Sequence, residues 1–167
     1  MARLLTVMLM SIALFASATT ASLASVEEEM AKRQAKLLFQ DITCDVGKVR
    51  TRYNAKVFGP DDWITTSEVR RRLPELRDLA WMMMVAESRA ARRLANPPGD
   101  WPTEIAPEID TYGDYKVRLM NVYRQMADAN TAVRFVELGK KGNKLGPGRA
   151  PDRIRVFLNV PEYPQGC

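Results

Sequence analysis

The chain has 167 residues, including 25 Lys or Arg and 20 Asp or Glu, and carries a formal net charge of +5. It contains no histidine, which excludes a Ser-His or Cys-His nucleophile and removes the commonest zinc ligand. Basic and acidic residues are interspersed along most of the sequence, so nucleic-acid binding has little support. A weak attraction to acidic envelope surfaces is the milder expectation from this charge.

The first 24 residues have the pattern of a cleaved signal peptide. Arg3 gives a basic start, an apolar run follows from residue 4 to 16, and Ser22 and Ala24 supply a small-x-small site. We therefore expect cleavage after Ala24 and a periplasmic or extracellular mature protein. An uncleaved anchor is the alternative, but a run of about 13 residues is shorter than the roughly 20 that span a bilayer.

The mature chain begins with a predicted helix over residues 26–57. Its apolar residues recur at intervals of three or four, which is typical of one helix face: Ala35, Leu38, Ile42, Val46, Val49 and Tyr53. Gly59 and Pro60 cannot continue a helix, so we expect it to end before them.

A second helix is predicted from about residue 66 to Ala95, with Thr65, Thr66 or Ser67 as its cap and Asn96–Pro102 as its stop. Met83 lies at the centre of its apolar arc. The other residues of that arc are Val69, Leu73, Leu76, Leu79, Ala80, Ala86, Ala90 and Leu94. Trp81 and Val85 point nearly the opposite way, and such an apolar surface needs cover from a partner protein, a second copy or the C-terminal tail.

A third helix is predicted over residues 107–138, ending at Gly139. Its apolar positions are regularly spaced by three or four residues, the pattern of a bundle or coiled-coil seam: Tyr112, Tyr115, Leu119, Val122, Met126, Ala129, Val133 and Val136. The sequence therefore predicts an all-α protein, a three-helix antiparallel bundle over residues 25–139.

Residues 140–167 are predicted to form a basic loop and an extended tail. Gly, Pro and Lys dominate "GKKGNKLGPGRAPD", and Ile154–Val160 forms a short β-like run that we expect to dock on the bundle. Cys44 and Cys167, the two cysteines, are expected to form a disulfide after export. Free thiols or an intermolecular bond are the alternatives. Because Cys44 lies opposite the core face, this bond would strap the tail across the outside of the first helix.

Glu87 is a carboxylate predicted to lie within the apolar arc of the second helix. The surrounding "VAESR" resembles the helix-borne Glu-Ser pair of the lytic transglycosylases, and the resemblance implies that Glu87 is the acid of a peptidoglycan-cleaving enzyme. Where that family continues with Gly-Leu-Met-Gln, this chain has "RAARRLANPPGDW". The alternative, which we favour, is that Glu87 pairs with an arginine or lysine of a neighbouring helix or lies at a gap in the bundle.

We expect neither a cofactor nor a bound metal. Clustered metal ligands and phosphate-binding glycine loops are absent from the sequence, and Met82, Met83 and Met84 point in three directions. The preferred hypothesis is an exported helical binding or accessory protein that acts through protein–protein interaction or self-association in the cell envelope. In general build it resembles small periplasmic helical accessory subunits and chaperones. Its predicted binding residues are Trp81, Val85, Arg89, Arg92 and Arg93.

Overall fold

The computed structural model describes residues 2–58 and 64–161, without the side chains of residues 2–27 and of Met30. The described chain is all-α, as predicted, but it has five helices instead of three helices and an extended tail. They are α1 (Ala2–Val57), α2 (Thr66–Ala95), α3 (Ala106–Ala127), α4 (Ala132–Asn143) and α5 (Ala150–Leu158). The predicted domain boundary after residue 139 falls inside α4.

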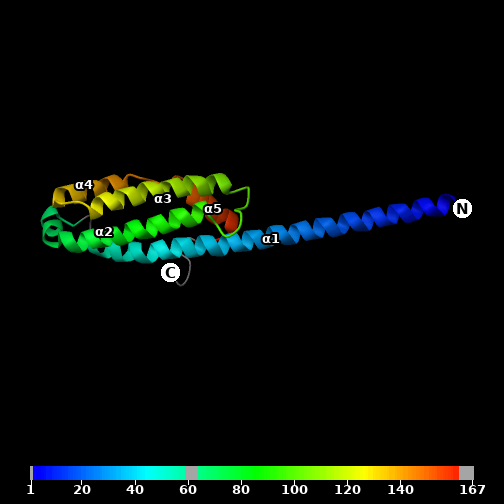
Figure 1. Cartoon of the computed structure of the whole chain (residues 1–167), viewed down its shortest axis with the longest axis horizontal. Helices are drawn as coiled ribbons and strands as arrows, with labels where there is room; N and C mark the ends of the chain where they lie inside the picture. The colour runs from blue at the N-terminus through cyan, green and yellow to red at the C-terminus, as the bar shows by residue number, and fades with distance from the viewer. Residues whose placement is uncertain (1, 59–63, 162–167) are drawn as a thin grey trace.

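The helix α2 packs against both α1 and α3, and each of these three helices runs opposite to the one before it (Figure 1). At one end α4 packs against α2 and α3, and at the other end α5 packs against α3 and α1 (Figure 1). Large aromatic side chains bridge α1 and α3. The ring centres of Phe39 and Tyr112 are 6.0 Å apart, and those of Tyr53 and Tyr123 are 5.4 Å apart.

The ends of α2 follow the predicted signals. Thr65 is the N-cap, and its hydroxyl accepts a hydrogen bond from the Glu68 backbone N–H at 3.3 Å. Glu68 in turn accepts the Thr65 backbone N–H at 2.9 Å, which completes a capping box. Pro74 lies inside α2, and the helix continues through it to Ala95.

The prediction of one helix over residues 107–138 is wrong, because the chain turns after Ala127 and α4 begins at Ala132. Thr131 caps α4 by accepting the Arg134 backbone N–H at 3.2 Å. The turn changes the buried face: Phe135 has no exposed surface, whereas Val133 of the predicted seam is 55% exposed.

The predicted extended tail is also wrong between residues 150 and 158, which form α5. Ala150, Ile154 and Leu158 are buried at intervals of four, the spacing of one helix face. Alternation of Ile154, Val156, Leu158 and Val160 fits a strand equally well, but Val156 is 82% exposed. Leu37, which the tail was expected to cover, is 58% exposed, and the rest of the tail after residue 161 lies outside the described residues.

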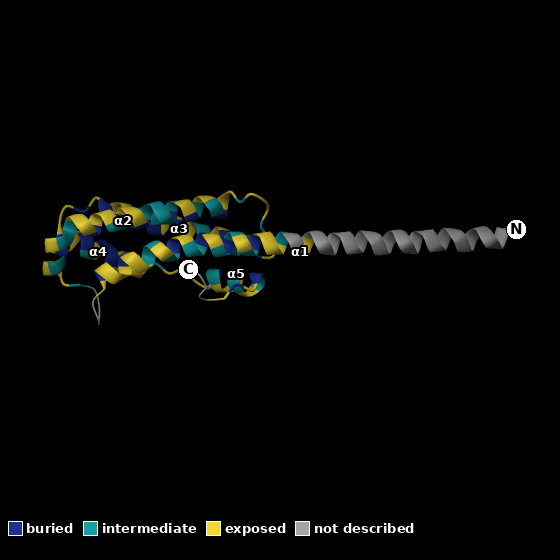
Figure 2. Cartoon of the chain, turned by 90° about the horizontal axis from the view of Figure 1, so that it is seen from below, coloured by how far each residue is buried: buried dark blue, intermediate teal, exposed yellow. Residues whose placement is uncertain are grey.

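The buried residues, dark blue in Figure 2, line the interior of the bundle. They form two apolar clusters, one toward each end. One cluster joins α1, α2, α3 and α5, and the other joins α1, α2, α3 and α4. On α2, Glu87 lies between Met83 of one cluster and Ala90 of the other, so a charged residue interrupts the apolar core near the middle of the bundle.

In the part of the chain that the structure describes, no helix is long and apolar enough to span a bilayer.

Candidate functional site

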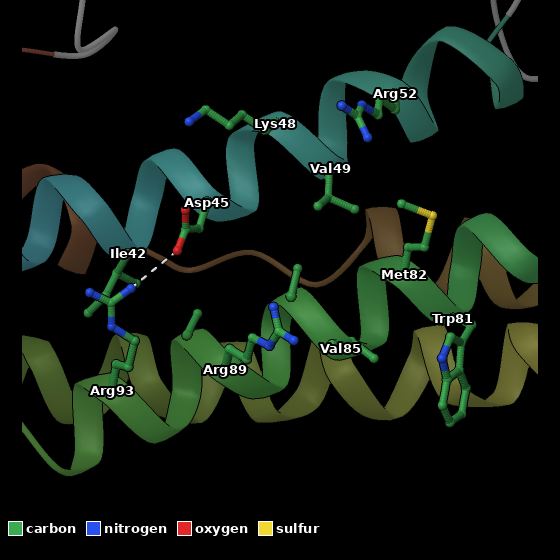
Figure 3. A pocket seen from close by; sticks show the side chains of 12 residues that line it. Ile42, Asp45, Lys48, Val49, Arg52, Trp81, Met82, Val85, Arg89 and Arg93 are labelled. Carbon is green, nitrogen blue, oxygen red and sulfur yellow. Dashed lines mark hydrogen bonds and ion pairs between the residues drawn. The ribbon is translucent and has the colours of Figure 1, made fainter. Parts of the chain in front are cut away.

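A groove of about 510 Å³ lies between α1 and α2 on the surface of the bundle (Figure 3). Its apolar lining consists of Ile42, Val49, Trp81, Met82, Val85, Ala86 and Ala90. Ala86 and Ala90 face α1 with the smallest side chain that a helix former can offer, so they leave space where larger residues would close the contact. The small side chains of Ala86 and Ala90 therefore contribute to the open space between the two helices.

Charged side chains line the rest of the groove: Asp45, Lys48, Arg52, Arg89 and Arg93. Arg93 reaches from α2 to Asp45 on α1, with Nη1 3.3 Å from Oδ2, and also pairs with Asp41 (Figure 3). Among the described residues, no acid lies within ion-pair distance of Lys48, Arg52 or Arg89. The groove thus combines apolar walls with three uncompensated positive charges.

The structure brings four of the five predicted binding residues to this groove. Trp81, Val85, Arg89 and Arg93 all line it. Arg92 does not, and its Nη2 instead donates to the Ser88 hydroxyl at 3.2 Å. Trp81 is 55% exposed, and its indole ring points away from α1 at the edge of the groove (Figure 3).

Glu87 lies in the core, where three helices contribute charges to one cluster. Its Oε1 accepts a hydrogen bond from Arg50 Nη2 of α1 at 2.9 Å, and its Oε2 lies 2.8 Å from Lys116 Nζ of α3. The Lys116 contact is an ion pair without the alignment of a hydrogen bond, and Oε2 has no hydrogen-bond partner in the described structure. The expectation that Glu87 pairs with cations of neighbouring helices is confirmed.

The three charges of this cluster differ in their access to water. Glu87 has no exposed surface and Lys116 is 1% exposed, whereas the Arg50 side chain is 41% exposed. Burial lowers the Arg50 pKa, but the charge and hydrogen bond of Glu87, together with smaller contributions from Tyr123 and Tyr115, raise this pKa above its ordinary value. The Lys116 ammonium also lies 4.9 Å from the ring centre of Tyr112, a cation–π contact.

The enzyme hypothesis requires a substrate oxygen within hydrogen-bond distance of the Glu87 carboxyl. Both carboxyl oxygens of Glu87 face cations, and the side chain has no exposed surface. A sugar would therefore reach this group only after the helices had separated around it. In this structure Glu87 is therefore a buried member of a three-charge cluster. Groups of three or more His, Cys, Asp or Glu able to hold a metal are absent from the described residues.

Sequence reasoning missed Arg50 and Lys116, although a signal was present. Arg50 continues the buried stripe of α1 between Val46 and Tyr53, and Lys116 follows Tyr112 by four residues on α3. A cation inside an apolar stripe indicates a buried partner of opposite charge. Glu87 is that partner for both.

The buried Tyr53 and the partly buried Tyr123, near this cluster, make stability depend on alkaline pH. Burial raises the pKa of Tyr123 to about 12 and also raises the pKa of Tyr53. The unfolded chain ionises its tyrosines near pH 10, so their contribution to stability is complete below about pH 10 and is lost as the pH rises further.

We expect the free energy of unfolding, measured in urea, to decline steadily above about pH 10. The decline should be shallower in Tyr123→Phe, which lacks the ionising group. Equal slopes for the two proteins would contradict this assignment.

The structure describes only one of the two cysteines of the predicted disulfide. Cys44 is half-buried on α1, and Cys167 lies outside the described residues, so their pairing stays a prediction.

No family model, curated protein or solved structure matches this chain.

Proposed function

We propose that this protein is exported to the cell envelope and holds a protein partner in the groove between α1 and α2. The observation that carries the proposal is the combination of the half-exposed Trp81 with a groove that has apolar walls and uncompensated cations. Tryptophan and arginine are the residues most enriched at the energetic centres of protein interfaces.

The occupant that fits this groove is an amphipathic helix with acidic side chains. On α2 the lining residues extend from Trp81 to Arg93, about 18 Å of helix, which equals roughly three turns of a partner helix. Its apolar face would lie on Val85 and Ala86, and its acids would meet Arg52 and Arg89. This mode of recognition uses anchors spaced by three or four residues.

Export is supported by the basic start, the apolar run and the small residues before Ser25. We expect the protein purified from its native host to begin at Ser25. Mass spectrometry before and after reduction would measure both this N-terminus and the Cys44–Cys167 bond, since reduction of one bond adds two hydrogens. An intact N-terminus retained in the cytosol would contradict export.

Trp81→Ala should weaken partner binding by tenfold or more, because loss of an aromatic anchor from a protein interface costs about 2 kcal/mol. The mature chain, immobilised, would capture proteins from solubilised native envelopes for identification by mass spectrometry. Val133→Ala is the matched control, since Val133 is also 55% exposed but lies on α4.

The supporting outcome is a protein retained by the original chain and by Val133→Ala but lost from Trp81→Ala. The affinities of all three chains for that purified protein then give the size of the effect. Retention of the same proteins by Trp81→Ala would contradict the proposal. So would digestion of purified peptidoglycan by a chain that captures no protein.

A further inference from the structure

A second hollow adjoins the groove on the other side of Trp81. It has a volume of about 370 Å³ and is lined by Pro74, Arg77, Asp78, Trp81, Ala127 and Asp128. We call it the acidic hollow. Trp81 is the residue that lines both spaces, so the groove and the acidic hollow form one continuous surface along α2.

The acidic hollow contains two carboxylates and one guanidinium, so its net charge is opposite in sign to that of the groove. Arg77 is held against the end of α3, where its Nε donates to the Ala127 carbonyl at 2.6 Å. Among the described residues, no cation lies within ion-pair distance of Asp78 or Asp128. The last carbonyls of α3 add partial negative charge to the same hollow, and Arg77 offsets the part that belongs to the Ala127 carbonyl.

The charge and polarity of the outward side chains of α2 therefore change in order along the helix axis. Asp78, Trp81, Val85 and Arg89 follow one another at intervals of three or four, so they share one face of the helix. An acidic end, an apolar centre and a basic end succeed one another along about 17 Å of helix between residues 78 and 89.

We infer that the partner segment carries its charges in the complementary order: acidic residues at the end over Arg52 and Arg89, and basic residues at the end over Asp78 and Asp128. Its apolar centre lies on Trp81 and Val85. This inference rests on the proposed function and adds to it the partner's charge order. Complementary charges at both ends would select this segment over a uniformly acidic one of equal apolar content.

Two synthetic helical peptides of about 18 residues with identical leucine faces provide the test. One has glutamates in its N-terminal half and lysines in its C-terminal half, and the other has glutamates throughout. By fluorescence anisotropy at low salt, the mixed peptide should bind the mature chain about tenfold more tightly than the acidic one. Salt should reduce this preference, because the charges at the rim are exposed.

Two double variants test the acidic end and the basic end of the surface separately. Asp78→Asn with Asp128→Asn should abolish the preference for the mixed peptide while the acidic peptide binds at least as well as before. Arg52→Glu with Arg89→Glu should weaken both peptides. Arg71→Glu with Arg118→Glu is the matched charge control, since both arginines are exposed and line neither space.

The outcomes distinguish this inference from the function on which it rests. Equal binding of both peptides, lost in Trp81→Ala, would overturn the charge order and leave the groove as a binding site. Failure of both peptides, with Trp81-dependent binding to vesicles of anionic phospholipid or Trp81-dependent dimers in sedimentation velocity, would overturn the charge order and the proposed partner together.

Discussion

Replacing Glu87 by leucine should lower the free energy of unfolding by about 3–5 kcal/mol, because it leaves the buried Lys116 ammonium without a counter-charge. Lys116 is 1% exposed, so water cannot replace the lost carboxylate. Urea unfolding followed by far-UV circular dichroism measures the change. Glu137→Leu is the control: Glu137 is exposed, and we expect its substitution to change stability by no more than about 0.5 kcal/mol.

The double variant Glu87→Leu with Lys116→Met should regain most of the stability that the single variant loses. It removes both fully buried charges and replaces them with apolar side chains of similar volume, an exchange that is often neutral or stabilising. Arg50 also loses its partner, but its side chain is 41% exposed and can be hydrated. A double variant no more stable than Glu87→Leu would show that the cluster contributes through something other than charge pairing.

Replacing Phe135 by alanine should destabilise the protein by about 3–5 kcal/mol, because the side chain is fully buried and its loss leaves a cavity. Val133→Ala should change stability by about 0.5 kcal/mol or less, since Val133 is 55% exposed. The same urea titration measures both variants.

This pair of variants distinguishes two helices from one. In a continuous helix, Val133 would lie about 20° from Met126 on the buried seam, and Phe135 would lie about 180° away on the outer face. The expected effects would then be reversed. A large loss in Val133→Ala with a small one in Phe135→Ala would therefore contradict the turn between α3 and α4.

Several features followed from local sequence, because each depends on a few neighbouring residues. The end of α2 after Ala95 and a cap at Thr65, Thr66 or Ser67 are examples, and the structure places the cap at Thr65. The periodicity around Met83 also indicated that Glu87 is buried and that Trp81 faces outward, as the structure shows. Helical spacing determines the direction of each side chain on its own helix, whatever packs against it.

The break between α3 and α4 escaped prediction because the apolar spacing continues across it. The turn at residues 128–131 contains neither glycine nor proline, so the usual interruption was missing. The signals present were Asp128, Asn130 and Thr131, polar residues that favour turns and helix caps. For α5, a window of seven residues fitted a strand as well as a helix, and the exposure of Val156 between the buried Ile154 and Leu158 decided between them.

The sequence by itself determined that the chain is helical, that α2 has a buried acid on one face and that Trp81 lies on the other. Only the tertiary structure decided that Arg50 and Lys116 meet that acid, and that a groove opens beside Ala86 and Ala90. The physical reason is one of range: a side chain's direction follows from its own helix, whereas the distance between helices depends on the volumes of side chains from all of them.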